Sequence, residues 1–110
     1  MKTDAPRGLF PGALEMMILR TLRREALHGY AIARSIRENS DDLLRVEEGS
    51  LYPALQRMLK AHWIEGEWVV SAQNRRVRQY RLTAAGRRQL ERESLQFDRM
   101  FTGILKVMKA

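Results

Sequence analysis

Apolar residues recur at helical spacing in three consecutive segments of the first half of the chain. The pattern predicts helices over residues 13–24, 30–39 and 50–61. Each predicted helix has one apolar face that can be buried against the others. The three faces consist of Leu14, Met17, Ile18 and Leu22, of Ile32, Ala33 and Ile36, and of Leu51, Leu55, Met58 and Leu59.

The links between these helices are short and polar. A tight His28-Gly29 link separates the first helix from the second, and a polar turn at residues 40–42 leads into a short extended piece at residues 43–46. Ser50 is expected to cap the third helix. Pro53 lies in the first turn of that helix, where its missing N–H costs little.

Two strand-like segments follow the third helix. Strands are expected over residues 64–70 and 77–82, joined by a polar loop into a β-hairpin. His62 and Trp63 are expected to anchor this hairpin to the core, and Trp68 is a further candidate for that role. Thr83 is expected to cap a last helix over residues 84–108. Three short helices followed by a hairpin have the order of a winged helix-turn-helix. The predicted fold is therefore mainly α with a small β-hairpin, a winged helix-turn-helix followed by a long C-terminal helix.

The last helix carries a repeating apolar seam. Its large side chains alternate in steps of four and three residues, which is the spacing of a coiled coil. We therefore expect a homodimer formed through this helix; the alternative is that the helix folds back onto its own first helix and the seam is ordinary core. The expected dimer contacts are Leu90, Phe97, Phe101, Ile104 and Met108.

Charge is unevenly distributed along the chain. The 110 residues are few enough for one domain, and the formal net charge is +7. Residues 1–55 contain eight basic and eight acidic side chains, whereas residues 56–110 contain twelve basic and five acidic ones, so the second half carries the whole excess. A solvated cationic face is one interpretation, and a polyanionic partner is the other.

The third helix and the hairpin contain the candidate DNA contacts. No acidic residue occurs between Ser50 and Trp63, as a helix that meets phosphate requires. Ser50 is expected to meet a phosphate through its hydroxyl and N–H groups, and arginines of the hairpin are expected to contact phosphate or the minor groove. For Tyr52 the alternative is a ring packed against the second helix. The candidate residues are Ser50, Tyr52, Pro53, Gln56, Arg57, Lys60, Arg75, Arg76 and Arg78.

Several functional classes find no support in the sequence. The chain has no Cys and only two His, far apart, so no metal site, cofactor or thiol chemistry is expected. The carboxylates have no partners arranged for acid–base catalysis, and we expect no enzyme. The longest strictly apolar run has four residues, so we expect no membrane partner and a soluble, cytoplasmic protein.

Three ordered motifs resemble those of PadR-type transcriptional regulators. Residues 28–32 (HGYAI) and residues 48–55 (EGSLYPAL) are similar to two signatures of that family, and residues 63–87 are similar to its wing and exit motif. The resemblance covers roughly residues 9–93. It implies a dimeric bacterial repressor that binds double-stranded DNA and is released by a small aromatic molecule or another stress signal. With a single helix after the wing, the chain is similar to the short subgroup.

The remaining expectations concern domain boundaries, an effector site and competing functions. We expect a flexible N-terminus over residues 1–8, a DNA-binding domain over residues 9–83 and a dimerisation helix over residues 84–110. Met17, Phe97 and Phe101 are candidates for an effector pocket, although a filled dimer core is the favoured explanation for them. The competing functions are a winged-helix adaptor that binds protein without DNA and an RNA-associated basic protein.

Overall fold

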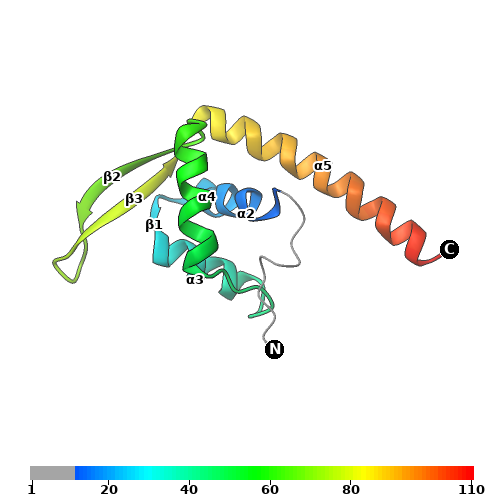
Figure 1. The fold of residues 1–110 in the computed structure, drawn as a ribbon, viewed down its shortest axis with the longest axis horizontal. Coiled ribbons are helices and arrows are strands. Elements are labelled where there is room, and N and C mark those ends of the chain that lie inside the picture. The colour runs from blue at the N-terminus through cyan, green and yellow to red at the C-terminus, as the bar shows by residue number, and fades with distance from the viewer. Residues whose placement is uncertain (1–11) are drawn as a thin grey trace.

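The computed structural model describes residues 12–110, and within them the expected order of elements is present (Figure 1). Helices α2 (Ala13–Arg24), α3 (Gly29–Asn39) and α4 (Glu48–Lys60) precede a hairpin of β2 (Ile64–Val70) and β3 (Arg76–Leu82), and α5 (Ala84–Met108) closes the chain. The winged helix-turn-helix architecture, mainly helical with a small sheet, is thus confirmed. The lead-in expected over residues 1–8 lies outside the described residues.

The sheet has one more strand than the sequence predicted. A two-residue strand, β1 (Leu27–His28), pairs antiparallel with Tyr80 and Gln79 of β3, which gives the strand order β1-β3-β2. His28 also begins α3, since its Nδ1 accepts the N–H of Ala31 at 3.4 Å. The link between the first two helices therefore ties the helices to the wing.

The expected start of the third helix was wrong. The helix begins at Glu48 with Glu47 as its N-cap, so Ser50 lies inside the first turns and does not cap it. The amide of Ser50 donates to the carbonyl of Glu47 at 3.0 Å, because the helical turn is already closed there. Residues 44–47 have no regular structure, so the expected extended piece at 43–46 forms no strand.

One apolar core joins the three helices to the base of the hairpin. Ile18, Ile32, Leu55 and Met58 are completely or almost completely buried, and Ile64 at the start of β2 joins them. No polar or charged residue in the described range is buried. Burial of these side chains, each contributing about 1.5–3 kcal/mol, fixes α4 between the other helices and the wing.

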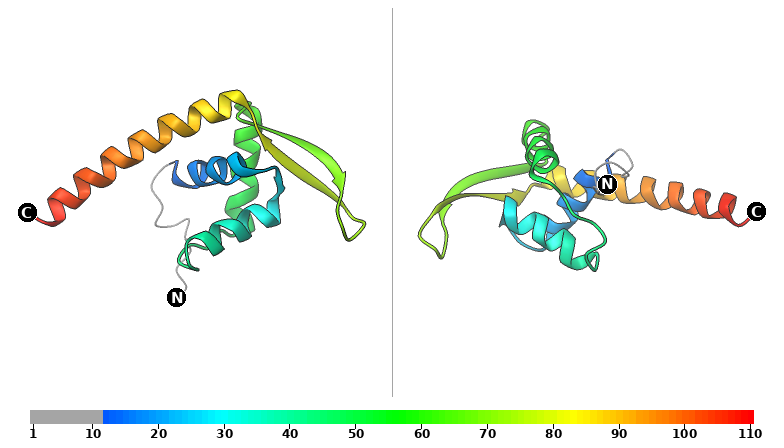
Figure 2. Two further views of the ribbon diagram at one scale, coloured as in Figure 1. Left: turned by 180° about the vertical axis from the view of Figure 1, so that it is seen from behind. Right: turned by 60° about the horizontal axis from the view of Figure 1, so that its bottom comes forward.

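Helix α5 leaves the domain from a well-bonded joint. The Thr83 N–H donates to the carbonyl of Trp63 at 3.1 Å, and the Thr83 hydroxyl donates to the carbonyls of His62 and Trp63. The same hydroxyl oxygen accepts the N–H of Gly86 at 3.0 Å, which confirms the predicted cap. From this joint the helix first passes over α2 and then projects beyond the domain (Figure 2).

Candidate nucleic-acid interface

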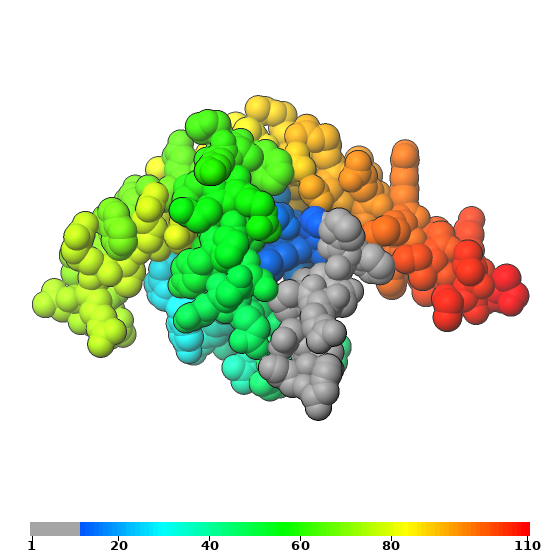
Figure 3. Space-filling view, in the orientation of Figure 1, coloured from blue at the N-terminus to red at the C-terminus, as the bar shows by residue number. Residues whose placement is uncertain are grey.

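Helix α4 presents one polar face to solvent. Its opposite face is held in the core by Leu51, Ala54, Leu55 and Met58, and this places the polar positions outward. In the space-filling view α4 lies along the front of the molecule beside the hairpin (Figure 3). The exposed candidate residues are Tyr52, Pro53, Gln56, Arg57 and Lys60.

The start of α4 differs from the expected phosphate site. Ser50 is only partly exposed, and its N–H is occupied by the carbonyl of Glu47. Two exposed carboxylates, Glu47 and Glu48, stand at the N-terminal end of the helix. Their negative charge opposes the attraction between a helix N-terminus and a phosphate.

Tyr52 packs against the second helix and is also partly exposed. A Cβ at Gly29 would lie 2.7 Å from the Tyr52 hydroxyl oxygen and 2.9 Å from its Cε1 atom, so the phenol ring packs closely over the start of α3. The side chain is still 41% exposed. The glycine of the link and the tyrosine of α4 therefore form one contact, and part of the ring remains exposed on the surface.

Arg57 is bound to a carboxylate on another helix. Its Nη2 and Nε atoms donate to one carboxylate oxygen of Glu15 at 2.6 and 3.1 Å. Glu15 belongs to α2, and its side chain is only 17% exposed. Unlike Gln56 and Lys60, Arg57 is thus held at the side of α4 that faces α2.

The two faces of the hairpin carry arginines in different states. On one face Arg81 bonds to Glu67 at 3.3 Å and to Glu65 at 3.1 Å, and these carboxylates raise the pKa of its guanidinium. On the other face the guanidinium carbon atoms of Arg76 and Arg78 lie 4.9 and 5.7 Å from the ring centroid of Trp68. Arg75, in the turn, is exposed.

Trp63, which precedes β2, and Trp68, which lies within it, have different surroundings. Trp63 is partly buried and packs against the core, as expected. Trp68 is 56% exposed, so it does not anchor the hairpin to the core. The core extends only as far along the sheet as Tyr80 and Leu82, and Trp68 lies beyond it.

The hairpin and α4 lie beside each other at one end of the molecule. Figures 1 and 2 place them away from the C-terminal end of α5, and Figure 1 shows the hairpin tip near the level of the first turn of α4. The structure therefore brings together two segments that the sequence had singled out separately. Their cations are Lys60, Arg75 and Arg76, which are exposed, and Arg78, which is partly exposed.

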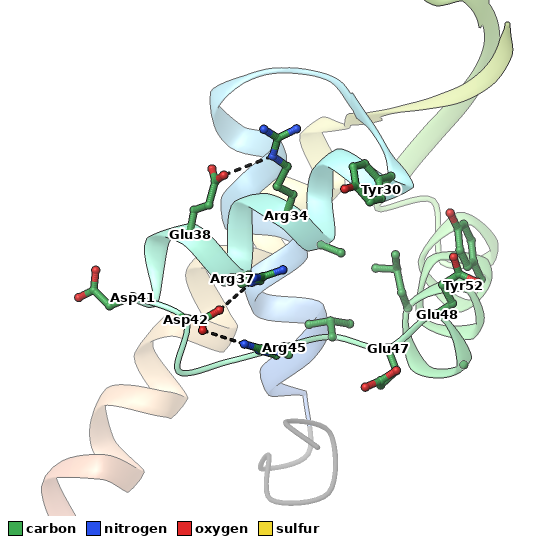
Figure 4. Close-up of a pocket in the computed structure, with 14 residues that line it drawn as sticks. Tyr30, Arg34, Arg37, Glu38, Asp41, Asp42, Arg45, Glu47, Glu48 and Tyr52 are labelled. Atoms are coloured by element: carbon green, nitrogen blue, oxygen red, sulfur yellow. Dashed lines mark hydrogen bonds and ion pairs between the residues drawn. The ribbon is translucent and has the colours of Figure 1, made fainter. Parts of the chain in front are cut away.

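A cleft of about 1050 Å³ separates α3 from the N-terminal end of α4 (Figure 4). Arg37 and Arg45 converge on Asp42 at one side of it, with bonds of 2.6 and 2.8 Å, while Tyr30 and Tyr52 stand at the other. Hydrogen bonds from Arg45 and Arg37 hold the pKa of Asp42 below its usual value.

The cleft does not extend the cationic surface. Five carboxylates and three arginines line it, so its net charge is negative. Tyr30 lines this cleft and is 67% exposed, and sequence reasoning did not single it out as a candidate residue. The available signal was its position directly after the His28-Gly29 link, at the start of a helix.

The seam of α5 is divided between two environments. Leu90 is 3% exposed and belongs to the core, so the expectation that it contacts a second subunit was wrong. The reason is that the first half of α5 packs on α2 of the same chain. Farther along, the rings of Phe97 and Phe101 stack at 5.8 Å, and Phe101, Ile104 and Met108 are 47%, 36% and 74% exposed.

The expected effector pocket is only partly assembled. Met17 and Phe97 line a hollow of about 220 Å³ between α2 and α5, together with Leu90. Phe101 does not line it, because that residue lies one turn farther along the projecting helix. The volume is below the usual range for a drug-sized ligand, about 300–1000 Å³.

Neither a metal-binding cluster nor a membrane-spanning helix is present among the described residues. Residues 12–110 contain no group of three or more His, Cys, Asp or Glu side chains placed to hold a metal ion. None of the helices in this range is long and apolar enough to cross a bilayer.

Comparison with known proteins identifies the family. A family model described as the transcriptional regulator PadR-like family matches residues 18–92. The chain belongs to the PadR-like family of transcriptional regulators. The PadR-like match extends from α2 into α5 and includes α4 and the whole hairpin.

Solved PadR-like structures share the fold. A PadR-like transcriptional regulator from Bacillus cereus has a TM-score of 0.76 at 29% identity, covering 91% of this chain and 95% of that one. A transcriptional regulator from Clostridium thermocellum has a TM-score of 0.80 at 26% identity, covering 87% of this chain and 93% of that one.

A relative is also found by sequence. An uncharacterized protein from Lysinibacillus sphaericus is 28% identical over 76 residues, which are 69% of this chain and 70% of that one.

Proposed function

We propose that the protein is a homodimeric transcriptional repressor that binds a specific double-stranded DNA site. The observation that carries this proposal is the placement of the polar face of α4 beside the arginine-bearing hairpin, at the end of the molecule away from the tip of α5. An α-helix fits the major groove, and a cationic hairpin can follow the neighbouring backbone.

Within this surface, base reading and phosphate binding fall to different residues. Gln56 is exposed at the middle of α4 and can bond the edge of adenine. Lys60, Arg75, Arg76 and Arg78 supply attraction to phosphate with little sequence choice. Tyr52 and Pro53 contribute from the first turns of the helix. Arg57 can join them in so far as DNA competes with Glu15 for its guanidinium.

The distal half of α5 supports the homodimer. Phe101, Ile104 and Met108 expose a large part of their apolar surface on one side of this projecting segment. A second copy packed along the same seam would remove that surface from water. Burial of apolar surface stabilises a complex by about 25 cal/mol per Å². Two DNA-reading ends are then held in one particle, as recognition of a two-part operator requires.

Release by a signal forms the last part of the proposal. The hollow lined by Met17 and Phe97 is small for a ligand, and residues from a second subunit would complete it. We expect a small apolar molecule bound there to quench tryptophan fluorescence in the native chain but not in Phe97→Ala. Equal binding by the variant would place the effector elsewhere.

The test of DNA binding is a titration at several salt concentrations. The probe is a labelled duplex of the promoter region upstream of the protein's own gene, with an unrelated duplex as competitor. If the four cations named above each neutralise one phosphate in both subunits, log affinity falls with log salt at a slope of about −7. A slope near zero, or no preference for the promoter duplex, would overturn the proposal.

Matched arginine variants and a reporter complete the design. Arg76→Ala should weaken binding and flatten the salt slope by about 2 per dimer, whereas Arg81→Ala should change neither greatly, because Arg81 is already paired with Glu65 and Glu67. Deletion of the gene should raise expression from the bound promoter if the protein represses. An adaptor that binds only protein would show no duplex binding. If the protein binds RNA, single-stranded RNA would displace it from the labelled duplex.

A further inference from the structure

The sheet register places one tryptophan and two arginines on the same face of the wing. Trp68 pairs directly with Arg78, and Val70 pairs with Arg76, while Gly66 pairs with Tyr80. Directly opposed residues of an antiparallel pair point to the same side of the sheet. This face begins in the core at Ile64 and Leu82, and it continues outward into solvent toward the tip.

Arg78 lies in a space made by aromatic rings and a glycine. Its guanidinium is 5.7 Å from the Trp68 ring and 6.0 Å from the Tyr80 ring. A Cβ at Gly66 would lie 2.6 Å from the Arg78 Nε atom, so a larger residue would displace this side chain. That Nε atom is buried and has no hydrogen-bond partner in the described part of the chain.

Arg76 shares the same support. It is exposed, and its guanidinium lies 4.9 Å from the centroid of the Trp68 ring. The two cations occupy neighbouring positions on one face, where their mutual repulsion would otherwise spread them apart. The electron-rich face of the indole attracts both of them.

This support orders the arginines without neutralising them. Arg81, on the other face, must break ion pairs with Glu65 and Glu67 before it can bind phosphate. Neither Arg76 nor Arg78 has an ion pair with an acidic side chain among the described residues. Their charges and their remaining N–H donors are therefore available to a polyanion, and less side-chain freedom remains to be lost on binding.

We propose that Trp68 is a positioning residue for DNA binding, which holds Arg76 and Arg78 on the wing in the orientation that meets the duplex. The inference rests on the proposed function and deepens it. It assigns the affinity supplied by the wing to a three-residue unit in which the uncharged member matters as much as either arginine.

The test compares Trp68→Ala with a conservative variant and a neighbouring control. Trp68→Ala should bind the promoter duplex about five- to tenfold more weakly, whereas Trp68→Phe, which keeps an aromatic face, should return to within about twofold of the native chain. Val70→Ala removes another exposed apolar side chain from the same face and should bind like the native chain. Thermal unfolding by circular dichroism verifies that each variant is folded.

The salt dependence separates positioning from a general loss of the wing. Trp68 carries no charge, so Trp68→Ala should keep the native salt slope, while Arg76→Ala should flatten it by about 2 per dimer. In the double variant Trp68→Ala/Arg76→Ala the loss should be smaller than the product of the two single losses, because each change removes part of one unit.

Three outcomes overturn the inference. Native affinity in Trp68→Ala means that the ring does not position the arginines. A slope flattened as in Arg76→Ala, without recovery in Trp68→Phe, means that Trp68 only maintains the hairpin. If the native chain binds neither the promoter duplex nor a random-sequence duplex, the proposed function fails and this inference fails with it.

Discussion

Among the described glycines, Gly86 is the position at which an added methyl group should destabilise the fold most. It lies in the first turn of α5, where the helix crosses the beginning of the wing. A Cβ at this position would lie 2.1 Å from the carbonyl oxygen of Trp63 and 2.7 Å from a methyl carbon of Leu82. The nearer of these atoms belongs to the backbone, so it cannot rotate away. Gly86→Ala therefore forces α5 and the wing apart.

The structure gives the sign and the size of the effect. Alanine is favoured over glycine inside a helix by about 0.8–1.0 kcal/mol, which opposes the damage. Overpacking of a close contact costs about 1–3 kcal/mol. The carbonyl of Trp63 also accepts the N–H and the hydroxyl of Thr83, and each weakened hydrogen bond costs about 0.5–1.5 kcal/mol. We expect a net loss of about 2–3 kcal/mol from a total stability of roughly 5–15 kcal/mol.

Urea unfolding followed by far-UV circular dichroism measures this loss at a fixed protein concentration. The same helix offers a matched control in Gly103→Ala, since no atom outside the helix's own backbone and its chain neighbours lies within 4 Å of a Cβ at Gly103. That variant should gain about 0.5–1 kcal/mol from helix propensity. Opposite signs for one substitution at two positions support the argument. Gly86→Ala as stable as Gly103→Ala would refute it.

Three further predictions concern the interface, the dimer and a turn. Glu15→Gln should free Arg57 from its ion pair. In a salt titration, duplex binding should then be about two- to fivefold tighter and the salt slope steeper by roughly 1 per subunit. Weaker binding would mean that Glu15 presents Arg57 to DNA. Phe101→Glu should raise the dimer dissociation constant at least about 100-fold in analytical ultracentrifugation. Leu95→Glu, at a position that is even more exposed than Phe101 but lies off the seam, should leave the dimer intact. In an NMR titration, the pKa of the Asp42 carboxyl should lie below its ordinary value of 3.8. Its contribution to stability is therefore present above pH 3.8 and is lost as the pH falls below 3.8. A midpoint at or above 3.8 would mean that the hydrogen bonds from its arginines do not persist in solution.

Elements with local causes were predictable from the sequence. The bounds of α2, β2 and α5 follow from periodicity and from the cap at Thr83, and the structure has them where the sequence placed them. Strand β1 was missed because two residues carry no period. It forms because the free edge of β3 accepts Leu27 and His28. Ser50 was misplaced because a good capping residue does not decide where a helix begins when the preceding turn can close first.

The candidate surface was predictable as a set of exposed positions but not as a set of interactions. Solvent exposure of the polar face of α4 follows from the apolar face opposite it. The pair of Arg57 and Glu15 joins residues 42 positions apart, and no local pattern connects them. The heptad spacing placed Leu90 on the seam correctly, but spacing does not say whether a seam meets the same chain or another. Tertiary packing of α5 on α2 decided that.

The connection at Thr83 allows α5 and the winged-helix domain to change independently in sequence. The hydrogen bonds of Thr83 couple α5 firmly to the base of the wing. A change in the direction of the helix would therefore turn the whole winged-helix domain with it. Inserting one residue into its projecting half would turn the seam by about 100° and lengthen the arm by about 1.5 Å, while leaving α4 untouched. In the proposed dimer, changes in α5 would therefore alter the distance and angle between the two DNA-binding ends, while changes in α4 would alter the choice of bases.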